Sequence, residues 1–226
     1  MNQKQAVGLR AASYVKDGMI VGLGTGSTAY YMIEELGRRV KEEQLNIIGV
    51  PTSLASKEQA QTLGIPVKTI DEVSHVDVTI DGADEISQDF QGIKGGGAAL
   101  LFEKIVATYS KQVIWIVDDS KMVSTLGKFP LPVEVVPYGA QQLFEQFQQQ
   151  GYQPSFRMTD DQQRKQTDSG HWIIDLHLDV IDDPFALAKE LDQLVGVVEH
   201  GLFLEMVHTI IIGTDTGTIV KEVRAH

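Results

Sequence analysis

Four short segments of the sequence are rich in hydroxyl, carboxylate or ammonium side chains, the groups that bind small anions and move protons, and three of the four also contain glycine. They are Gly24-Thr25-Gly26-Ser27-Thr28, Asp81-Gly82-Ala83-Asp84, Lys94-Gly95-Gly96-Gly97 and Asp118-Asp119-Ser120-Lys121. Three of them follow an apolar run and one opens such a run. Ligands of an open parallel sheet bind at the carboxyl ends of its strands. We therefore expect the four segments to lie at one sheet edge.

The first segment predicts a phosphate site. It is similar to the dinucleotide-binding fingerprint, but Ser27 stands where that pattern needs its third glycine. The acid that would bind a ribose is also missing, because residues 50–53 are Val-Pro-Thr-Ser. The N–H groups of a helix N-terminus, beside the hydroxyls of Ser27 and Thr28, suit a single phosphate instead. An ordinary helix cap after a glycine turn is the alternative.

The segment from Lys94 to Gly97 predicts a second anion-binding element. Three successive glycines let a ligand approach the backbone closely, and consecutive N–H groups can line a concavity. Lys94 adds a full positive charge. A flexible surface loop is the alternative, but the glycines lead directly into an apolar helix, which favours a functional role.

Asp81 and Asp84 follow a predicted strand, where carboxylates could bind sugar hydroxyls, transfer protons or hold a divalent metal. Metal binding is the weaker of these interpretations, because His75 precedes the strand and no third ligand is evident. An aspartate-rich turn without function is the remaining alternative.

Glu103 borders the apolar face of a helix predicted over residues 98–109. It lies within two turns of the glycine segment, where apolar neighbours would raise the pKa of its carboxyl group toward that of a general base. A solvated glutamate paired with a lysine is an equally good interpretation from the residues alone. Lys121, similarly, could complete an anion pocket or be a surface lysine.

The elements that position these residues predict an α/β fold. Apolar runs at residues 19–23, 46–50, 76–80 and 113–117 alternate with helical patterns, which predicts a Rossmann-like parallel sheet with helices on both faces. Three prolines between residues 130 and 137 then mark a boundary. The order that follows is the βαββαβ arrangement of a smaller, ferredoxin-like α+β domain. A final hairpin around residues 215–217 returns the chain to the first sheet. We expect one domain from residues 1–128 plus 206–226 and another from residues 129–205.

The composition of the chain limits which partners it can bind, which chemistry it can use and where it can act. The 226 residues carry a formal net charge of −12, which disfavours nucleic acid and anionic membranes. The chain has no cysteine, which removes disulfides, thiolate catalysis and cysteine-bound zinc. No apolar run is long enough to span a bilayer, and the polar start is unlike a signal peptide. We expect a cytoplasmic protein.

The four segments, together with Glu103, resemble those of type A ribose-5-phosphate isomerase. The resemblance covers nearly the whole chain, including Thr167-Asp168-Ser169-Gly170 and the run from Gly196 to Phe203. His171 departs from it, because the family usually has asparagine there. The resemblance implies interconversion of ribose 5-phosphate and ribulose 5-phosphate in the pentose phosphate pathway. It also implies a homo-oligomer, with a homodimer favoured, that uses no cofactor and no metal.

By position, the resemblance makes Glu103 the base that transfers a proton between two carbons through an enediolate. Lys94, the glycine N–H groups or Lys121 would stabilise the developing negative charge, and Asp81 or Asp84 would assist ring opening. The residues implied to contact substrate are Thr25, Gly26, Ser27, Thr28, Asp81, Gly82, Ala83, Asp84, Lys94, Gly95, Gly96, Gly97 and Lys121. Lys4 is a further candidate for the phosphate.

Two classes of alternative function remain. One is another phosphosugar enzyme of related fold, such as an aminosugar-phosphate deaminase or a lactonase. The other is a sugar-phosphate-sensing domain that binds without turnover.

Overall fold

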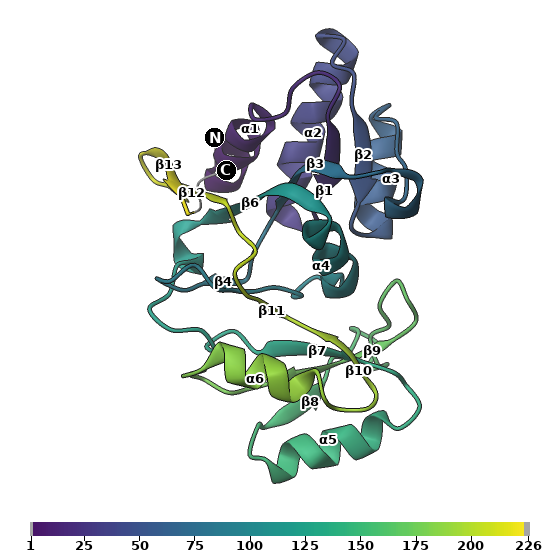
Figure 1. Cartoon of the computed structure of the whole chain (residues 1–226), viewed down its shortest axis with the longest axis vertical. Coiled ribbons are helices and arrows are strands. Elements are labelled where there is room, and N and C mark those ends of the chain that lie inside the picture. The colour runs from purple at the N-terminus through teal and green to yellow at the C-terminus, as the bar shows by residue number, and fades with distance from the viewer. Residues whose placement is uncertain (1, 224–226) are drawn as a thin grey trace. The chain divides into compact units, whose positions relative to one another are not determined.

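The computed structural model describes residues 2–223, which form two compact units (Figure 1). Of the described residues, the first comprises residues 2–83, Phe102–Lys121 and residues 206–223, and the second comprises Asp84–Leu101 and Met122–Glu205. Met1 and residues 224–226, which the predicted first domain includes, lie outside the described residues. Within residues 2–223, no helix is both long and apolar enough to cross a membrane.

The first unit is built on a six-stranded sheet with the order β13-β12-β6-β3-β1-β2. Every neighbouring pair from β12 to β2 is parallel, and only β13 runs antiparallel. This confirms the predicted parallel sheet and the returning hairpin. The strands are β1 (Ile20–Leu23), β2 (Ile48–Pro51), β3 (Val76–Asp81), β6 (Ser110–Asp118), β12 (Thr209–Thr214) and β13 (Gly217–Glu222).

Helices cover both faces of this sheet. The helices are α1 (Gln3–Ala12), α2 (Ser27–Glu42), α3 (Leu54–Thr62) and α4 (Leu100–Thr108), with a short 3₁₀ turn, η1, at Ile70–Glu72. Buried residues of α1 and α2 share one apolar cluster with alternate residues of the strands, among them Val78 and Ile80. Val106 of α4 instead lies against the position that a Cβ of Gly22 would occupy, beside Thr79, and these strand residues alternate with the others and so point to the other face. The helices therefore form the two outer layers expected for a doubly wound sheet.

The second unit contains a four-stranded antiparallel sheet with the order β10-β7-β9-β8. Its elements are β7 (Leu131–Val135), α5 (Ala140–Gln149), β8 (Pro154–Phe156), β9 (Trp172–Leu176), α6 (Pro184–Leu191) and β10 (Val197–His200). This is the predicted βαββαβ arrangement. Leu131, Val133 and Val135 pack with apolar residues of both α5 and α6, as residues on one face of a strand should.

The second unit also contains a three-stranded sheet that sequence patterns did not indicate. It consists of β4 (Glu85–Ile86), β5 (Gly92–Ile93) and β11 (Leu202–Phe203), in the order β11-β5-β4. The buried carboxylate of Glu85 anchors it, accepting hydrogen bonds from the N–H groups of Gly127 and Phe129 at 2.8 and 2.7 Å. Strands of two residues carry no detectable periodicity, so they escaped prediction.

Asp77 on β3 is hydrogen-bonded to residues of β1 and β6, and its carboxylate should make the free energy of unfolding depend on pH. Its carboxylate accepts hydrogen bonds from Ile20 N–H at 2.9 Å and from Lys111 Nζ at 2.8 Å. Partial burial acts to raise the pKa of Asp77, but these two hydrogen bonds outweigh it and lower the pKa below its ordinary value. A lowered pKa stabilises the fold above the unfolded-state value of about 3.9, and this stabilisation is lost as the pH falls below it.

We therefore expect Asp77→Asn to reduce the free energy of unfolding at pH 7 by about 1 kcal/mol, and by less at pH 3. Urea denaturation of both proteins at the two pH values measures the difference. Asp71→Asn, at an exposed position, is the control and should change little at either pH. An equal loss at pH 7 and pH 3 for Asp77→Asn would show that the charge of Asp77 is unimportant.

Candidate functional site

The carboxyl ends of β1 and β3 lie side by side at the point where the strand order reverses. The chain passes from β1 to β2 on one side and then crosses to β3 on the other side of β1. The register pairs Leu23 with Ile80, so Gly24 and Asp81 are the next residues on the two strands. Such a switch point is the usual ligand-binding position in this class of sheet.

Asp81 joins the two strand ends. The side chain is buried, and its Oδ1 accepts hydrogen bonds from the N–H groups of Thr25 at 3.0 Å and Gly82 at 2.8 Å. Gly24 leaves room for this arrangement, because a Cβ atom there would lie 2.3 Å from Oδ1 and 2.5 Å from the Asp81 Cα. The structure therefore brings Gly24–Thr28 and Asp81–Gly82 together, as the sequence predicted.

Gly24→Ala should damage this arrangement directly. Since the clash includes backbone, we expect Asp81 and the turn to move, with a loss of about 1 to 3 kcal/mol in stability and about 10²-fold in kcat/KM. Gly64→Ala is a control for destabilisation without a clash: its φ of 78° strains an alanine, but its Cβ would meet nothing within 4 Å. Thermal melts and activity assays should show destabilisation in both variants and lost activity only in Gly24→Ala.

The helix after β1 begins without a side-chain cap. Gly26 is the N-cap residue of α2, with a φ of 101° that favours glycine, and the first turn of α2 has no acidic residue. Lys4 Nζ donates a hydrogen bond to Ser27 Oγ at 2.8 Å, which brings a positive charge to this helix end. Free N–H groups, a hydroxyl and an ammonium group together suit an anion such as phosphate.

A cavity opens beside this helix end. Lys4, Thr25, Gly26, Ser27, Tyr31 and Asp118 are among the residues that line it. No pattern in the sequence distinguishes Tyr31 from the apolar residues of the same helix, so its place in the cavity could not be predicted. Lys121, in contrast, lies in the short turn η2 (Asp119–Lys121) and is not among the described residues lining the cavity.

Glu103 is buried, with 5 % of its surface exposed. The C-terminal end of its helix lies at the start of β3, since the carbonyl of Tyr109, just after α4, accepts a hydrogen bond from the Val76 N–H. Val106 lies close to Gly22 of β1, and Glu103 is one turn nearer the helix N-terminus on the same face. The carboxylate therefore lies toward the strand ends that carry Gly24 and Asp81, and burial removes the interpretation as a solvated surface glutamate.

Within the second unit, Lys94 is buried, with 3 % of its surface exposed. Its Nζ lies 5.3 Å from the centre of the Phe203 ring, a cation–π distance. Its main-chain N–H donates to the carbonyl of Gly201 at 2.9 Å. Gly201 permits this contact, because a Cβ there would lie 2.3 Å from the Lys94 carbonyl oxygen. Phe203 and Gly201 come from a distant part of the chain, and no local pattern indicated their role.

The glycine segment is tied to Asp84. Oδ2 of Asp84 accepts a hydrogen bond from the Gly96 N–H at 2.8 Å, and a side chain on Gly96 would collide with that carboxylate. Gly95 has a φ of 110° and Ala98, unusually for a residue with a Cβ, a φ of 62°. Such strained conformations concentrate at functional sites. The second unit thus brings together Asp84 and Lys94–Gly97.

His171, the departure from the family pattern, lies in the second unit, directly before β9. Its Nδ1 is 3.0 Å from Oε1 of Glu134, a buried carboxylate of β7 that also accepts a hydrogen bond from Thr167 Oγ1 at 2.8 Å. The residue therefore has a local structural partner.

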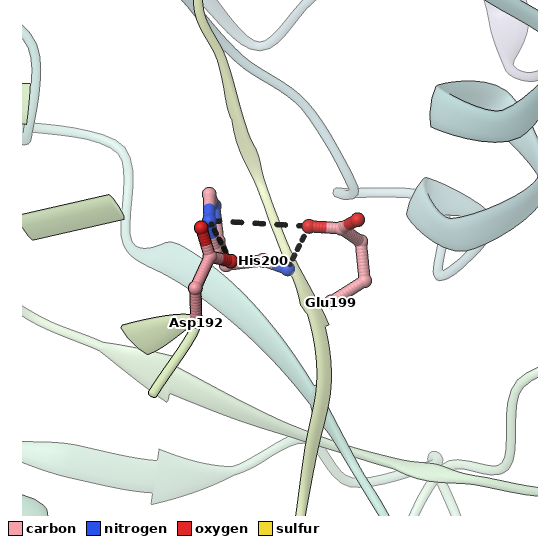
Figure 2. A group of neighbouring side chains, drawn as sticks. All are labelled: Asp192, Glu199 and His200. Carbon is pink, nitrogen blue, oxygen red and sulfur yellow. Dashed lines mark hydrogen bonds and ion pairs between the residues drawn. The ribbon is translucent and has the colours of Figure 1, made fainter. Parts of the chain in front are cut away.

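A cluster of Asp192, Glu199 and His200 has the residue types of a metal site (Figure 2). The His200 Nδ1 accepts a hydrogen bond from the Leu202 N–H at 3.2 Å, so a neutral ring carries its proton on Nε2. That atom faces Asp192 Oδ1 at 3.2 Å. A metal would need the Nε2 lone pair, so the geometry fits a histidine hydrogen-bonded to a carboxylate.

The chain matches the family model described as ribose 5-phosphate isomerase A (phosphoriboisomerase A) over residues 48–217. It is 67% identical to a ribose-5-phosphate isomerase A of Enterococcus faecalis over 217 residues, covering 96% of each chain. One from Lactiplantibacillus plantarum is 60% identical over 227 residues, covering 99% of this chain and all of the relative.

Solved structures agree with these sequence matches. Ribose 5-phosphate isomerase A from Methanocaldococcus jannaschii superposes with a TM-score of 0.92 at 41% identity, covering 97% of this chain and 98% of the other. A D-ribose-5-phosphate isomerase in complex with phospho-erythronic acid superposes with a TM-score of 0.95 at 37% identity, covering 98% and 100%. The chain belongs to the ribose 5-phosphate isomerase A family.

Proposed function

We infer that this chain interconverts D-ribose 5-phosphate and D-ribulose 5-phosphate in the pentose phosphate pathway. Family membership supports the reaction, and a relative that is 37% identical binds phospho-erythronic acid, a phosphorylated sugar acid. The observation that carries the proposal for the site is the burial of Glu103 on the helix facing the ends of β1 and β3. A buried carboxylate beside an anion-binding turn suits proton transfer on a sugar phosphate.

In this proposal Glu103 removes the proton from C2 of the open-chain aldose and returns it to C1. The carbonyl oxygen at C1 gains a proton as the C2 hydroxyl loses one, so the reaction balances within the substrate. The intermediate is an enediolate whose negative charge needs hydrogen-bond donors. Lys94 and the N–H groups of Gly95, Gly96 and Gly97 are the proposed donors, and Lys121 is a second cationic candidate.

Ring opening and phosphate binding use the other residues. Asp81 and Asp84 are the proposed groups that exchange protons with the ring oxygen and the C1 hydroxyl. The phosphate is proposed to bind at the start of α2, to the N–H groups and hydroxyls of Thr25–Thr28 and to Lys4, with Gly82 and Ala83 lining the substrate. Binding of the phosphate orients the sugar for proton transfer. Each step moves only protons, so the proposed mechanism uses no cofactor and no metal.

The test is an assay of the wild-type protein with ribose 5-phosphate, in the presence of a chelator. Turnover is expected and should persist with the chelator. Glucosamine 6-phosphate serves as the competing substrate, because a deaminase would release ammonia from it, and a lactone substrate tests for lactonase activity. Ribose 5-phosphate binding without turnover would instead favour the sensing domain, and activity abolished by chelation would contradict the metal-free mechanism.

We also propose that the enzyme is a homodimer and acts in the cytoplasm. The reaction supports the second proposal, since it uses an intermediate of central sugar metabolism. Sedimentation equilibrium tests the first, with a mass of about twice the 24.9 kDa of one chain expected. Cell fractionation tests the second.

A further inference from the structure

We propose that Arg157 is a positioning residue for isomerisation, acting through the peptide groups of the glycine segment; this rests on the proposed function of that segment. Arg157 directly follows β8, far from Lys94–Gly97 in sequence. Its Nη1 donates hydrogen bonds to the carbonyl of Gly95 at 2.6 Å and to the carbonyl of Gly96 at 3.2 Å. One side chain therefore holds two successive peptide groups.

Asp175 on β9 fixes the direction of the guanidinium group. Its Oδ2 accepts a hydrogen bond from Arg157 Nε at 2.9 Å, and its Oδ1 accepts one from Nη2. The two side chains are 16% and 14% exposed, so the pair is largely shielded from water. A planar, two-point contact of this kind restricts rotation. With Nε and Nη2 held by Asp175, Nη1 is left to face the glycine segment.

Because each peptide group is planar, holding its carbonyl oxygen also fixes the direction of the N–H group on its other side. In a trans peptide the C=O and the following N–H point in opposite directions. The Gly95 carbonyl faces Arg157, and the Gly96 N–H on the other side of the same peptide reaches Asp84 Oδ2 at 2.8 Å. The Gly96 carbonyl also faces Arg157, so the Gly97 N–H must likewise point away from it.

Three successive glycines cannot fix these orientations by themselves. Without Cβ atoms they have more backbone conformations than any other residues, so their peptide groups rotate readily. A rotated peptide would present a carbonyl oxygen where the proposed enediolate needs a donor, and it would release Asp84. Arg157 prevents this from the far side of the segment. It is thus expected to affect the rate of proton transfer more than the binding of the phosphate.

The test is Arg157→Met, which keeps the apolar stem and removes the guanidinium group. We expect kcat for ribose 5-phosphate to fall about 10²-fold while KM changes less than about threefold. Methylguanidinium should restore part of kcat in Arg157→Ala, and ethylammonium should not. Arg164→Met is the matched control: Arg164 stacks on Phe156 at 3.8 Å and Trp172 at 4.4 Å in the same unit. It should keep wild-type kcat.

If Arg157→Met folds poorly, the variant Arg157→Lys and amide hydrogen exchange still test the proposal. Arg157→Lys retains the charge opposite Asp175 but cannot bind Asp175 and the two carbonyls together, so kcat should still fall at least about tenfold. Amide hydrogen exchange at Gly96, which needs no turnover, should be faster in both variants than in the wild type. If the wild type lacks isomerase activity but this difference in exchange is seen, the proposed function fails and the positioning role stands. Unchanged exchange, or wild-type kcat in a folded variant, overturns the role of Arg157.

Discussion

Glu103→Gln is expected to lower kcat for ribose 5-phosphate by about 10² or more, because general-base catalysis typically contributes 10² to 10⁴ to the rate. Glutamine has nearly the same size, so the buried position on α4 should stay filled. The amide cannot accept the C2 proton, whereas the turn after β1 that is proposed to bind the phosphate is unaltered. KM and the affinity for phospho-erythronic acid should therefore change little. Initial rates in both directions, with ligand binding measured by calorimetry, separate the two effects.

Glu145→Gln provides the control for this variant, since Glu145 is an exposed residue of α5 and its charge change is identical. It should behave like the wild type in rate and in thermal stability. Glu103→Asp is informative as well, because it retains a carboxylate but retracts it by one methylene. A Glu103→Gln protein with full activity would remove Glu103 as the base.

The second large effect is expected for Lys94→Met. Methionine fills nearly the volume of the lysine stem and can pack against Phe203, so the protein should be as stable as the wild type or more so. Loss of the buried positive charge should nonetheless lower kcat/KM by about 10² to 10³, the usual cost of removing one donor to a developing oxyanion. Steady-state kinetics and thermal melts on the same samples measure both quantities.

Whether the loss in kcat/KM comes from kcat or from KM identifies the role of Lys94. A fall in kcat assigns its charge to the enediolate, and a rise in KM with constant kcat assigns it to the phosphate. Lys189→Met, an exposed substitution on α6, makes the same change of charge and should have no effect. A value of kcat/KM for Lys94→Met within about threefold of wild type would exclude both roles.

Much of the fold was predictable because its long elements have strong periodicity. The run Val113–Val117 is uniformly apolar, as a strand buried on both faces must be, and it forms the centre of β6. The ends of the elements were predicted less accurately: the helix predicted over residues 98–109 spans Leu100–Thr108. Helix ends depend on cap geometry that periodicity does not contain.

Residues of the candidate site could be selected from the sequence where anion-binding or acidic residue types directly follow a predicted strand, as at Gly24–Thr28 and Asp81. Glu103 was not decided by its pattern, because periodicity places a residue on a face but does not give its depth. Arg157, Gly201 and Phe203 were missed for a different reason. Their contacts with the segment around Lys94 join residues far apart in sequence, and such contacts exist only after the sheet of the second unit has formed.

The carboxylate of Asp81 has a consequence for altering the substrate of this enzyme. Oδ1 of Asp81 accepts hydrogen bonds from the main-chain N–H groups of Thr25 and Gly82. The turn proposed to bind the phosphate and an acid proposed to act on the sugar ring are therefore coupled, so that neither can move without the other. Remodelling the turn to accept an unphosphorylated pentose would also displace the acid. Directed evolution toward such sugars should therefore require paired changes at both strand ends, with single substitutions in the turn losing turnover before any new specificity is gained.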